Sequence, residues 1–383
     1  MREIALYIHV PFCIQKCRYC DFISYPSCQP EFISNYFQTL SQELQIRAEQ
    51  DDDFSNIVLK SIYFGGGTPS LVSPEVLSDF LIILRRNFLI SDTIEITLEA
   101  NPGTLNSEKI KEFAHLGVNR LSVGVQSFQN RFLSFLGRTY QEKDVHSFLK
   151  DLINTGSFLN WSCDLIYGLP LQTFSDWKKE IEYLLWYKPP HFSLYNLTLS
   201  PRVPLGSFSK SHRALFPGQD WEASIYRWTQ LVLRKYGYRR YEISNFAQPE
   251  YQCLHNLTYW RNQEYLGLGV SACSYLKGIR MRNTSSLSHY QQKIKFHQSP
   301  VVMKDILTLK QKLSEEMILA LRTSEGIETE KLLKHYPDNL VQEKLNLLEQ
   351  MAQSNFINKM KGRWALTSRG TLIANQIFLE ILD

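Results

Sequence analysis

The stretch HVPFCIQKCRYCDFISY, residues 9–25, decides the fold. It places Cys13, Cys17 and Cys20 within eight residues, and Phe22 follows where a further cysteine would extend the series. Three thiolates spaced C-x3-C-x2-C on a loop bind three corners of a cubane [4Fe-4S] cluster, because each cysteine presents sulfur to one iron. The fourth iron is then open to a ligand from outside the protein. The spacing therefore predicts an iron–sulfur site directly after a first strand.

A structural zinc ion is the main alternative for these cysteines. Such a site wants four protein ligands, and the nearest candidates for the fourth are His9, on a predicted strand, and Cys28, beyond the motif. Seven unevenly spaced cysteines without export features indicate a reducing cytosol and thiols used in chemistry, and the N-terminus is typical of a first strand rather than a signal peptide. We expect a cytoplasmic protein. Attachment to a membrane surface is left open.

The length and composition of the chain narrow the class of protein to which it can belong. The chain has 383 residues, 44% hydrophobic and 21% charged, which is typical of one extended core with a smaller attached domain. Its 42 basic and 38 acidic residues give a net charge of +4, too mild to indicate nucleic acid binding. No stretch approaches the roughly 18 to 20 apolar residues of a membrane span.

Apolar, β-branched runs alternate with helical patterns along most of the chain. This alternation predicts βαβ units and a parallel sheet. Polar residues follow the ends of at least five strands, and parallel α/β folds gather their ligands at these ends, so we expect a barrel-like arrangement rather than a flat sheet. The predicted strands lie at residues 4–10, 57–64, 93–100, 120–128, 159–168 and 192–199, and the helices at 32–48, 74 onward, 109–116, 143–153, 177–186 and 221–236.

The last part of the chain has a different pattern. Residues 239–303 are rich in aromatic residues, Asn and Gly and are interpreted as a bridging segment, and residues 304–383 are mostly helical with a short hairpin around Lys361 and Gly362. This predicts a winged-helix-like domain. Because residues 304–383 hold 11 basic and 11 acidic residues, a packing or partner role is favoured over nucleic acid. The expected domains are 1–238, 239–303 and 304–383.

The cysteine motif resembles that of the radical S-adenosylmethionine (SAM) superfamily, in which the open iron binds the amino and carboxylate groups of SAM. GGGTPS at 65–70 is similar to the glycine-rich motif of that superfamily, where the lack of side chains lets the backbone approach the methionine amino group. The resemblance narrows to the group of oxygen-independent coproporphyrinogen III oxidase and the heme chaperone HemW. It rests on YIHVPFC, GGGTPS, LEANPGT, SVGVQSF, LGR and DLIYGLP, in that order. It implies a radical-SAM partial (β/α)6 TIM-like barrel with the C-terminal helical winged-helix-like domain.

The resemblance also implies a set of SAM-binding residues. Carboxylates suit the ammonium and sulfonium of SAM, amides and carboxylates accept from ribose hydroxyls, and an arginine suits its carboxylate. A structural ion pair is the alternative for Arg138 and Asp164. The implied residues are Tyr7, Tyr19, Gly66, Gly67, Thr68, Glu99, Gln126, Arg138 and Asp164, with Cys13, Cys17 and Cys20 on the cluster.

Two features separate the branches of this group. The oxidase motif resembles C-x3-C-x2-C-x-C, whereas this chain has Phe22 at the last position, as the HemW branch does. The stretch HNLTYW, 255–260, matches the H-N-x-x-Y-W pattern of HemW-like chaperones, and histidine is a common ligand of heme iron. His255 is the candidate heme residue, as axial ligand or as a supporting group, and Cys253 is a rival ligand.

The resemblance therefore implies a heme chaperone that uses a [4Fe-4S] cluster and SAM and delivers heme to respiratory-chain hemoproteins, with peripheral contact at the inner face of the cytoplasmic membrane. Oxidative decarboxylation of coproporphyrinogen III is the alternative, and it is not expected with Phe22 in place of the cysteine. Whether SAM is cleaved and whether the protein forms a homodimer are left open. Five basic residues near this stretch either pair with heme propionates or are solvated at the surface. They are Arg239, Arg240, Lys277, Arg280 and Arg282.

Overall fold

The computed structural model describes residues 2–26, 29–50 and 54–382. All six predicted strands are present, as neighbours in one parallel sheet. A seventh parallel strand, β11 (Tyr265–Leu268), pairs with the first and was not predicted. The six predicted strands are β1 (Arg2–Val10), β4 (Ile57–Gly66), β5 (Leu89–Ala100), β6 (Arg120–Gln126), β7 (Asn160–Tyr167) and β8 (His191–Asn196).

Antiparallel strands extend both edges of this sheet. Beyond β11 lie β12 (Cys273–Leu276), β13 (Ile279–Asn283) and β14 (Val301–Ile306), and beyond β8 lie β10 (Asn245–Ala247) and β9 (Arg239–Arg240). Within the described ranges β14 and β9 do not pair with each other, so the barrel is partial and open, as predicted. Residues 239–303 supply strands to both edges, and the domain boundaries at 238 and 303 stay predictions.

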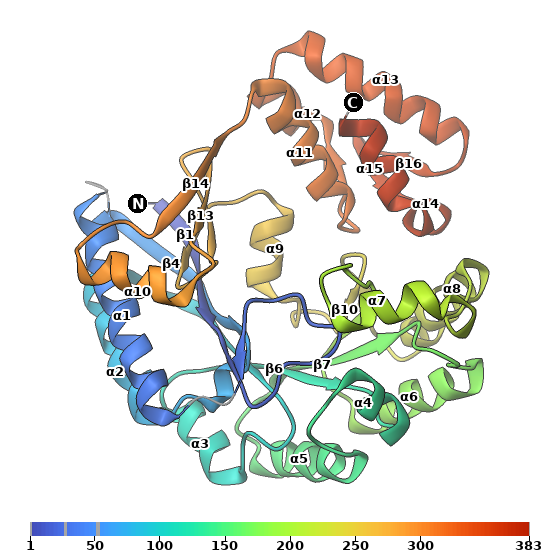
Figure 1. The fold of residues 1–383 in the computed structure, drawn as a ribbon. Helices are drawn as coiled ribbons and strands as arrows, with labels where there is room; N and C mark the ends of the chain where they lie inside the picture. Colours follow the sequence, from blue (N-terminus) through green and yellow to red (C-terminus); the bar gives the residue numbers. More distant parts are fainter. Residues whose placement is uncertain (1, 27–28, 51–53, 383) are drawn as a thin grey trace.

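Amphipathic helices cover the convex face of the sheet (Figure 1). Their apolar sides join the strands in one large core. The predicted start of the second of these helices is confirmed, because the Ser73 hydroxyl accepts a hydrogen bond from the Val76 amide and Pro74 is the first helical residue. These helices are α1 (Pro30–Glu49), α2 (Pro74–Asn87), α3 (Ser107–His115), α5 (Glu142–Thr155), α6 (Phe174–Tyr187) and α8 (Gln219–Lys235), and the short α4 (Asn130–Leu136) and α7 (Pro204–Ser211) were not predicted.

One helix lies on the concave side of the sheet. This is α9 (Leu254–Trp260), which carries the HNLTYW stretch and packs against β4 (Figure 1). The carboxylate of Glu95 on β5 holds its first turn, because it accepts hydrogen bonds from the amides of Leu254 and His255, both at 3.1 Å. The stretch is thereby fixed inside the barrel.

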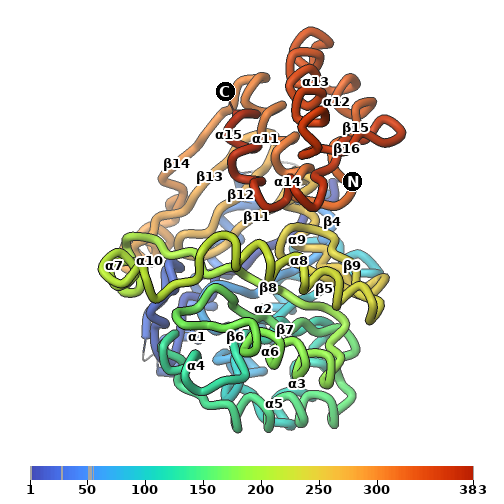
Figure 2. The backbone as a smooth tube through the Cα atoms, turned by 90° about the vertical axis from the view of Figure 1, so that its right-hand side faces the viewer, coloured from blue at the N-terminus to red at the C-terminus, as the bar shows by residue number. Residues whose placement is uncertain are grey.

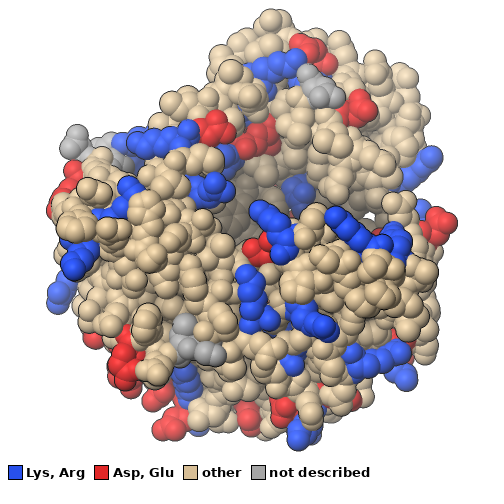
Figure 3. Space-filling view, in the orientation of Figure 1, with Lys and Arg blue, Asp and Glu red and all other residues tan. Residues whose placement is uncertain are grey.

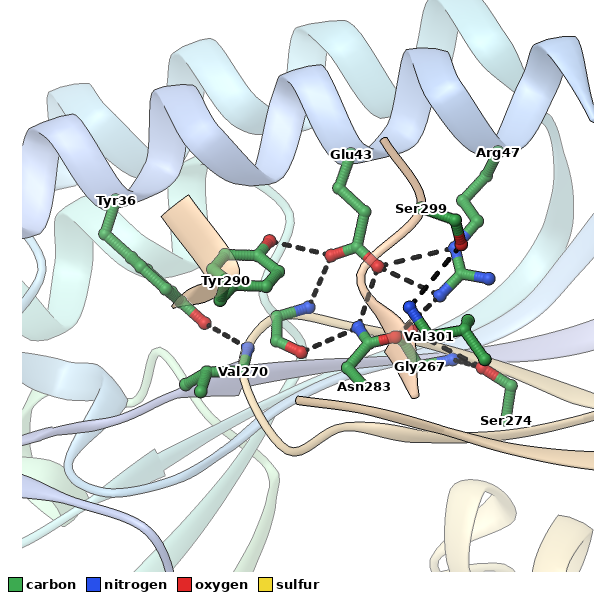
Figure 4. A network of polar contacts seen from close by, with 11 residues as sticks. Tyr36, Glu43, Arg47, Gly267, Val270, Ser274, Asn283, Tyr290, Ser299 and Val301 are labelled. Carbon is green, nitrogen blue, oxygen red and sulfur yellow. Dashed lines mark hydrogen bonds and ion pairs between the residues drawn. The ribbon is translucent and has the colours of Figure 1, made fainter. Parts of the chain in front are cut away.

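A buried polar network fastens the β11 edge of the sheet to α1 (Figure 4). The Glu43 side chain is fully buried and accepts hydrogen bonds from the Gly269 amide (2.8 Å), the Tyr290 hydroxyl (2.7 Å) and the Asn283 amide group (2.8 Å). Arg47, one turn along α1, donates to the same carboxylate at 3.1 Å. Tyr290 lies on α10 (Leu287–Lys295), so helix, strands and connecting loop are held by one carboxylate.

The C-terminal unit has a core of its own. As predicted, it is mostly helical and holds a hairpin, β16 (Ile357–Met360) with β17 (Arg363–Leu366), joined by β15 (Ile327–Glu328). Figures 1 and 2 show the unit at one end of the barrel, where α11 contacts α9. Its helices are α11 (Leu309–Leu321), α12 (Thr329–His335), α13 (Asp338–Gln353), α14 (Ser368–Leu372) and α15 (Ala374–Leu382). Among the described helices, none is long and apolar enough to cross a membrane.

Candidate functional site

A cavity of about 510 Å³ lies among the carboxyl ends of the parallel strands, on the concave side of the sheet. The structure brings eleven of the thirteen predicted site residues to its wall. Tyr7 and His255 are the two that lie behind the wall. The lining includes Cys13, Cys17, Cys20, Tyr19, Gly66, Gly67, Thr68, Glu99, Gln126, Arg138 and Asp164.

The loop that carries the three cysteines is anchored by backbone hydrogen bonds to two helical segments. The Arg18 amide donates to the Leu136 carbonyl at the end of α4 (3.0 Å), and the Leu205 amide of α7 donates to the Arg18 carbonyl (3.1 Å). All three thiols are free. Burial raises the pKa of Cys13 and of Cys20, so iron binding at these sulfurs would release protons.

The structure also bears on the zinc alternative. His9 uses both ring nitrogens within the protein, Nδ1 at 3.0 Å from the Tyr7 hydroxyl and Nε2 at 2.9 Å from the Ile23 carbonyl oxygen. Cys28 lies outside the described residues. Within those described, no group of three or more His, Cys, Asp or Glu side chains is placed to hold a single metal ion.

The glycine-rich loop packs directly on the cysteine loop. The Gly67 amide donates to the Val10 carbonyl (2.8 Å) and the Thr68 amide to the Phe12 carbonyl (2.7 Å). A Cβ atom at Gly67 would lie 2.6 Å from the Phe12 carbonyl oxygen, and Gly66 has a φ of +110°. Both positions therefore require glycine, one for close approach and one for its backbone conformation.

Glu99 at the end of β5 is the main acidic group on the wall. Its carboxylate accepts hydrogen bonds from the Tyr63 hydroxyl (2.9 Å) and from the Gly66 amide (3.0 Å). Burial raises the pKa of Glu99 to about 7, although these two hydrogen bonds oppose the shift. A cationic ligand beside Glu99 would favour its ionised form.

A chain of hydrogen bonds links Arg138 to the first cysteine. The Arg138 Nη1 atom donates to Asn101 Oδ1 (3.1 Å), Asn101 Nδ2 donates to the Thr68 hydroxyl (3.0 Å), and that hydroxyl donates to the Cys13 sulfur (3.6 Å). The Arg138 guanidinium also donates to the Tyr19 hydroxyl and lies over the Tyr19 ring. Arg138 is thereby held at the cysteine-loop end of the cavity.

Gln126 and Asp164 complete the polar wall. Gln126 has a φ of +66°, a left-handed conformation that is uncommon for a residue with a side chain and that ends the pairing of β6 with β7 in a register shift. Asp164 on β7 accepts hydrogen bonds from the hydroxyls of Ser162 (2.8 Å) and Ser122 (3.1 Å). Burial raises the pKa of Asp164.

His255 lies behind this wall, 1% exposed. Its Nδ1 atom lies 2.9 Å from the Ser61 hydroxyl and its Nε2 atom 2.8 Å from the Tyr259 hydroxyl. The ring is stacked on Tyr63, and Tyr7 packs on the same tyrosine. Iron could reach either nitrogen of His255 only if a hydroxyl partner moved away.

Sequence reasoning missed several residues of the wall. Arg120 is the first residue of the predicted strand 120–128, and a charged residue at the start of an apolar strand was the available signal. By contrast, the five basic residues considered for heme propionates, Arg239, Arg240, Lys277, Arg280 and Arg282, are not part of this wall. Other missed lining residues are Tyr63, Asn101, Tyr140, Tyr195 and Asn256.

Comparison with known proteins shows the family to which the chain belongs. Residues 7–184 match the radical SAM superfamily, and residues 307–373 match the HemN C-terminal domain. The chain is 34% identical over 379 residues to heme chaperone HemW of Lactococcus lactis, covering 99% of this chain and 97% of that protein. The chain belongs to the heme chaperone HemW family. Heme chaperone HemW of Bacillus subtilis is also 34% identical, over 98% of both chains.

The fold of this HemW family member matches a solved structure. Coproporphyrinogen III oxidase from Escherichia coli superposes with a TM-score of 0.85 at 24% identity, over 99% of this chain and 90% of that one. At this identity the likeness shows the fold alone. The radical SAM family implies a [4Fe-4S] cluster and SAM, and the cavity of this HemW family member fits both, with three free cysteines, a glycine cradle, two partly buried carboxyl groups and an arginine on one wall.

Proposed function

We propose that this protein is a heme chaperone, which binds heme and delivers it to hemoproteins of the respiratory chain. The match of nearly the whole chain to proteins named heme chaperone HemW carries the proposal. Phe22 supports it, because the side chain stands at the cavity wall, 63% exposed, where the oxidase motif would place a cysteine.

The cavity residues have distinct parts in this proposal. Cys13, Cys17 and Cys20 hold the cluster, and Glu99 and Asp164 complement the positive charges of SAM. Arg138 supplies a guanidinium for a carboxylate beside the cysteine loop. When bound to SAM, such a cluster supplies an electron for reductive cleavage of the sulfonium bond. Whether the protein uses that chemistry or only the binding energy is measured by the release of 5′-deoxyadenosine.

Helix α9 is the proposed heme contact. It carries HNLTYW and reaches from the cavity wall at Asn256 to the C-terminal unit, where Trp260 lies 4.6 Å from the Arg322 guanidinium and Arg261 pairs with Glu325 at 2.9 Å. His255 serves as iron ligand only after one of its hydroxyl partners is released. Cys253 is fully buried and is the rival ligand.

Charge on the surface supports an anionic cargo. The face seen in Figure 3 is hollowed where the C-terminal unit meets the barrel, and Lys and Arg side chains gather around the hollow. The carboxylates of heme would be attracted there. Transfer of heme to respiratory acceptors would bring the protein into peripheral contact with the inner face of the cytoplasmic membrane. The protein would act there as a monomer or as a homodimer. The proposal gives nucleic acid no role.

An anaerobic titration of the cluster-reconstituted protein with heme, followed by absorbance, tests the proposal. We expect saturable binding and no conversion of coproporphyrinogen III to protoporphyrinogen IX in a parallel assay with SAM and reductant. Absence of saturable heme binding would contradict the chaperone function. Protoporphyrinogen formation would establish the oxidase alternative instead.

A further inference from the structure

Arg120 is a buried cation that the functions described so far do not use. It is the first residue of β6, its side chain is 1% exposed, and it lines the cavity. Within the described residues its guanidinium makes neither a hydrogen bond nor an ion pair, and its buried Nε atom has no partner. A buried charge without a hydrogen-bonded partner is destabilising, so a guanidinium placed this way favours a bound anion.

The carboxylates of the described residues make no direct ion pair with Arg120. Glu95 is committed to the amides of Leu254 and His255 at the start of α9, and Asp164 to the hydroxyls of Ser122 and Ser162. Neither carboxylate lies within ion-pair distance of Arg120. Glu95 and Cys253 favour the charged form of Arg120 from beyond contact distance, and the hydrogen bonds of the guanidinium stay open to a bound molecule.

Arg120 lies at the end of β6 that is farther from the cysteine loop. Arg120 opens β6 and Gln126 ends it, and six residues of strand span about 20 Å. Arg138 already stands at the cysteine loop, bonded to Tyr19 and Asn101. The cavity thus has a guanidinium at each end, one beside the cluster cysteines and one at the floor.

The guanidinium of Arg120 is the group with free donors at the floor of the cavity. Ser122 and Ser193 also line the cavity, but their hydroxyls bond to Asp164. Arginine binds carboxylates through two parallel hydrogen bonds, and it does so most strongly where water is excluded.

We propose that Arg120 is the binding residue for a heme propionate at the floor of the cavity. This inference rests on the proposed heme chaperone function. The carboxylate of SAM has the same chemistry as a propionate, but Arg138 already supplies a guanidinium beside the cysteine loop, and Arg120 is therefore assigned to the propionate. Heme then enters with a carboxylate toward β6 rather than lying wholly on the surface.

The first test leaves the protein unchanged. Cluster-reconstituted wild-type protein is titrated anaerobically with heme and with heme dimethyl ester, in which both propionates are esterified. We expect the free acid to bind at least about tenfold more tightly, the effect of a charged hydrogen-bonded pair. Equal affinities would overturn the assignment. Absence of binding by either compound would contradict the proposed function itself, so the two failures are distinguishable.

The second test uses Arg120→Gln, with Arg120→Lys as the charge-preserving variant and Arg234→Gln, an exposed arginine of α8 away from this cavity, as the matched control. We expect Arg120→Gln to weaken heme binding at least about tenfold and to abolish the preference over the ester. Arg120→Lys should retain part of that preference. Arg234→Gln should bind as the wild type does.

SAM affinity and iron content, measured on the same variants, identify the source of the carboxylate. We expect both to be unchanged in Arg120→Gln. A variant that loses SAM affinity but keeps the heme preference would assign Arg120 to SAM and overturn the proposal. If Arg120→Gln does not fold, the comparison of heme with its ester on the wild type still decides.

Discussion

The Nδ1 atom of His255 lies 2.9 Å from the hydroxyl oxygen of Ser61, and both side chains are buried. This contact, with the Tyr259 hydroxyl at the other ring nitrogen, fixes the histidine of the HNLTYW stretch as a neutral ring. Burial lowers the pKa of His255 to about 3, and the positive charge of Arg120 adds to the effect. The ring is therefore uncharged throughout the physiological range.

Because the His255 ring is neutral in the folded protein, the free energy of unfolding depends on pH. The unfolded chain gains a proton at His255 below about pH 6.5, whereas the folded protein does not until about pH 3, so stability should fall on acidification through that window. The slope contributed by this one residue is about 1.4 kcal/mol per pH unit. We expect urea midpoints between pH 6.5 and 4.5 to fall less steeply in His255→Asn than in the wild type.

His297 offers the control for that experiment. It is an exposed histidine whose Nε2 atom lies 2.6 Å from a carboxylate oxygen of Glu49. We expect His297→Asn to keep the wild-type slope. Equal slopes for His255→Asn and the wild type would show that His255 is solvated or protonated in the folded protein.

The raised pKa of Glu99 predicts that the affinity for SAM depends on pH. Its pKa of about 7 is raised by burial, so the carboxyl group is largely neutral below pH 7 in the unliganded protein. If the ionised form binds the SAM ammonium, SAM affinity should rise up to tenfold per pH unit below pH 7 and level off above it. Isothermal titration between pH 5.5 and 8.5 measures this.

The matched variant for that prediction is Glu99→Gln, which keeps the shape and the acceptor for Tyr63 but has no proton to lose. We expect weaker SAM binding and a flat pH profile. If SAM affinity of the wild type did not change with pH, the SAM ammonium would be bound by a group other than Glu99. If SAM affinity of Glu99→Gln still changed with pH, another group would be the one that titrates.

The parallel sheet followed from the sequence because each strand is an apolar run bounded by an amphipathic helix. β11 was missed because its four residues pair with β1 across more than 250 residues of chain, and no local pattern encodes such a contact. α4 and α7 were missed because elements of seven and eight residues show barely two turns of periodicity.

Most motif residues were placed well because they lie near the carboxyl ends of strands, where the topology gathers them, whereas Tyr7 within β1 lies behind the wall. His255 was different. The motif marks it for function, yet its burial and its two hydroxyl partners depend on Ser61 and on the position of α9 inside the barrel. Arg120 gave only the weak signal of a charged residue in an apolar strand, since only the fold shows that none of the described residues forms a hydrogen bond or ion pair with its guanidinium.

Removing one cysteine should remove the cluster. In Cys17→Ser the loop loses one of three thiolates, and two are too few to hold a cubane with an open iron. We expect the charge-transfer absorbance and the iron and sulfide content of the reconstituted protein to fall to background. Cys273→Ser, an exposed cysteine on β12, should retain wild-type values, and retained iron and sulfide in Cys17→Ser would refute the ligand assignment.

Glu43 is the position where a single change should loosen the β11 edge of the sheet. Glu43→Ala leaves Arg47 as a buried guanidinium without its carboxylate, and it strips the Gly269 amide, the Tyr290 hydroxyl and the Asn283 side chain of their acceptor. Breaking a buried charged pair in this way costs about 3 to 5 kcal/mol. We expect a marked fall in the urea midpoint of unfolding, and earlier proteolysis between residues 260 and 300 than elsewhere.

Glu49→Ala tests the same chemistry at the surface of the same helix. Glu49 pairs with His297, both side chains are more than half exposed, and such pairs contribute at most about 1 kcal/mol. The contrast between the two variants isolates burial, because each removes one carboxylate from α1. If Glu43→Ala were no less stable than Glu49→Ala, the network would not be what holds β11 and α10 to α1, and apolar packing of Tyr36 and Tyr290 would have to account for that edge.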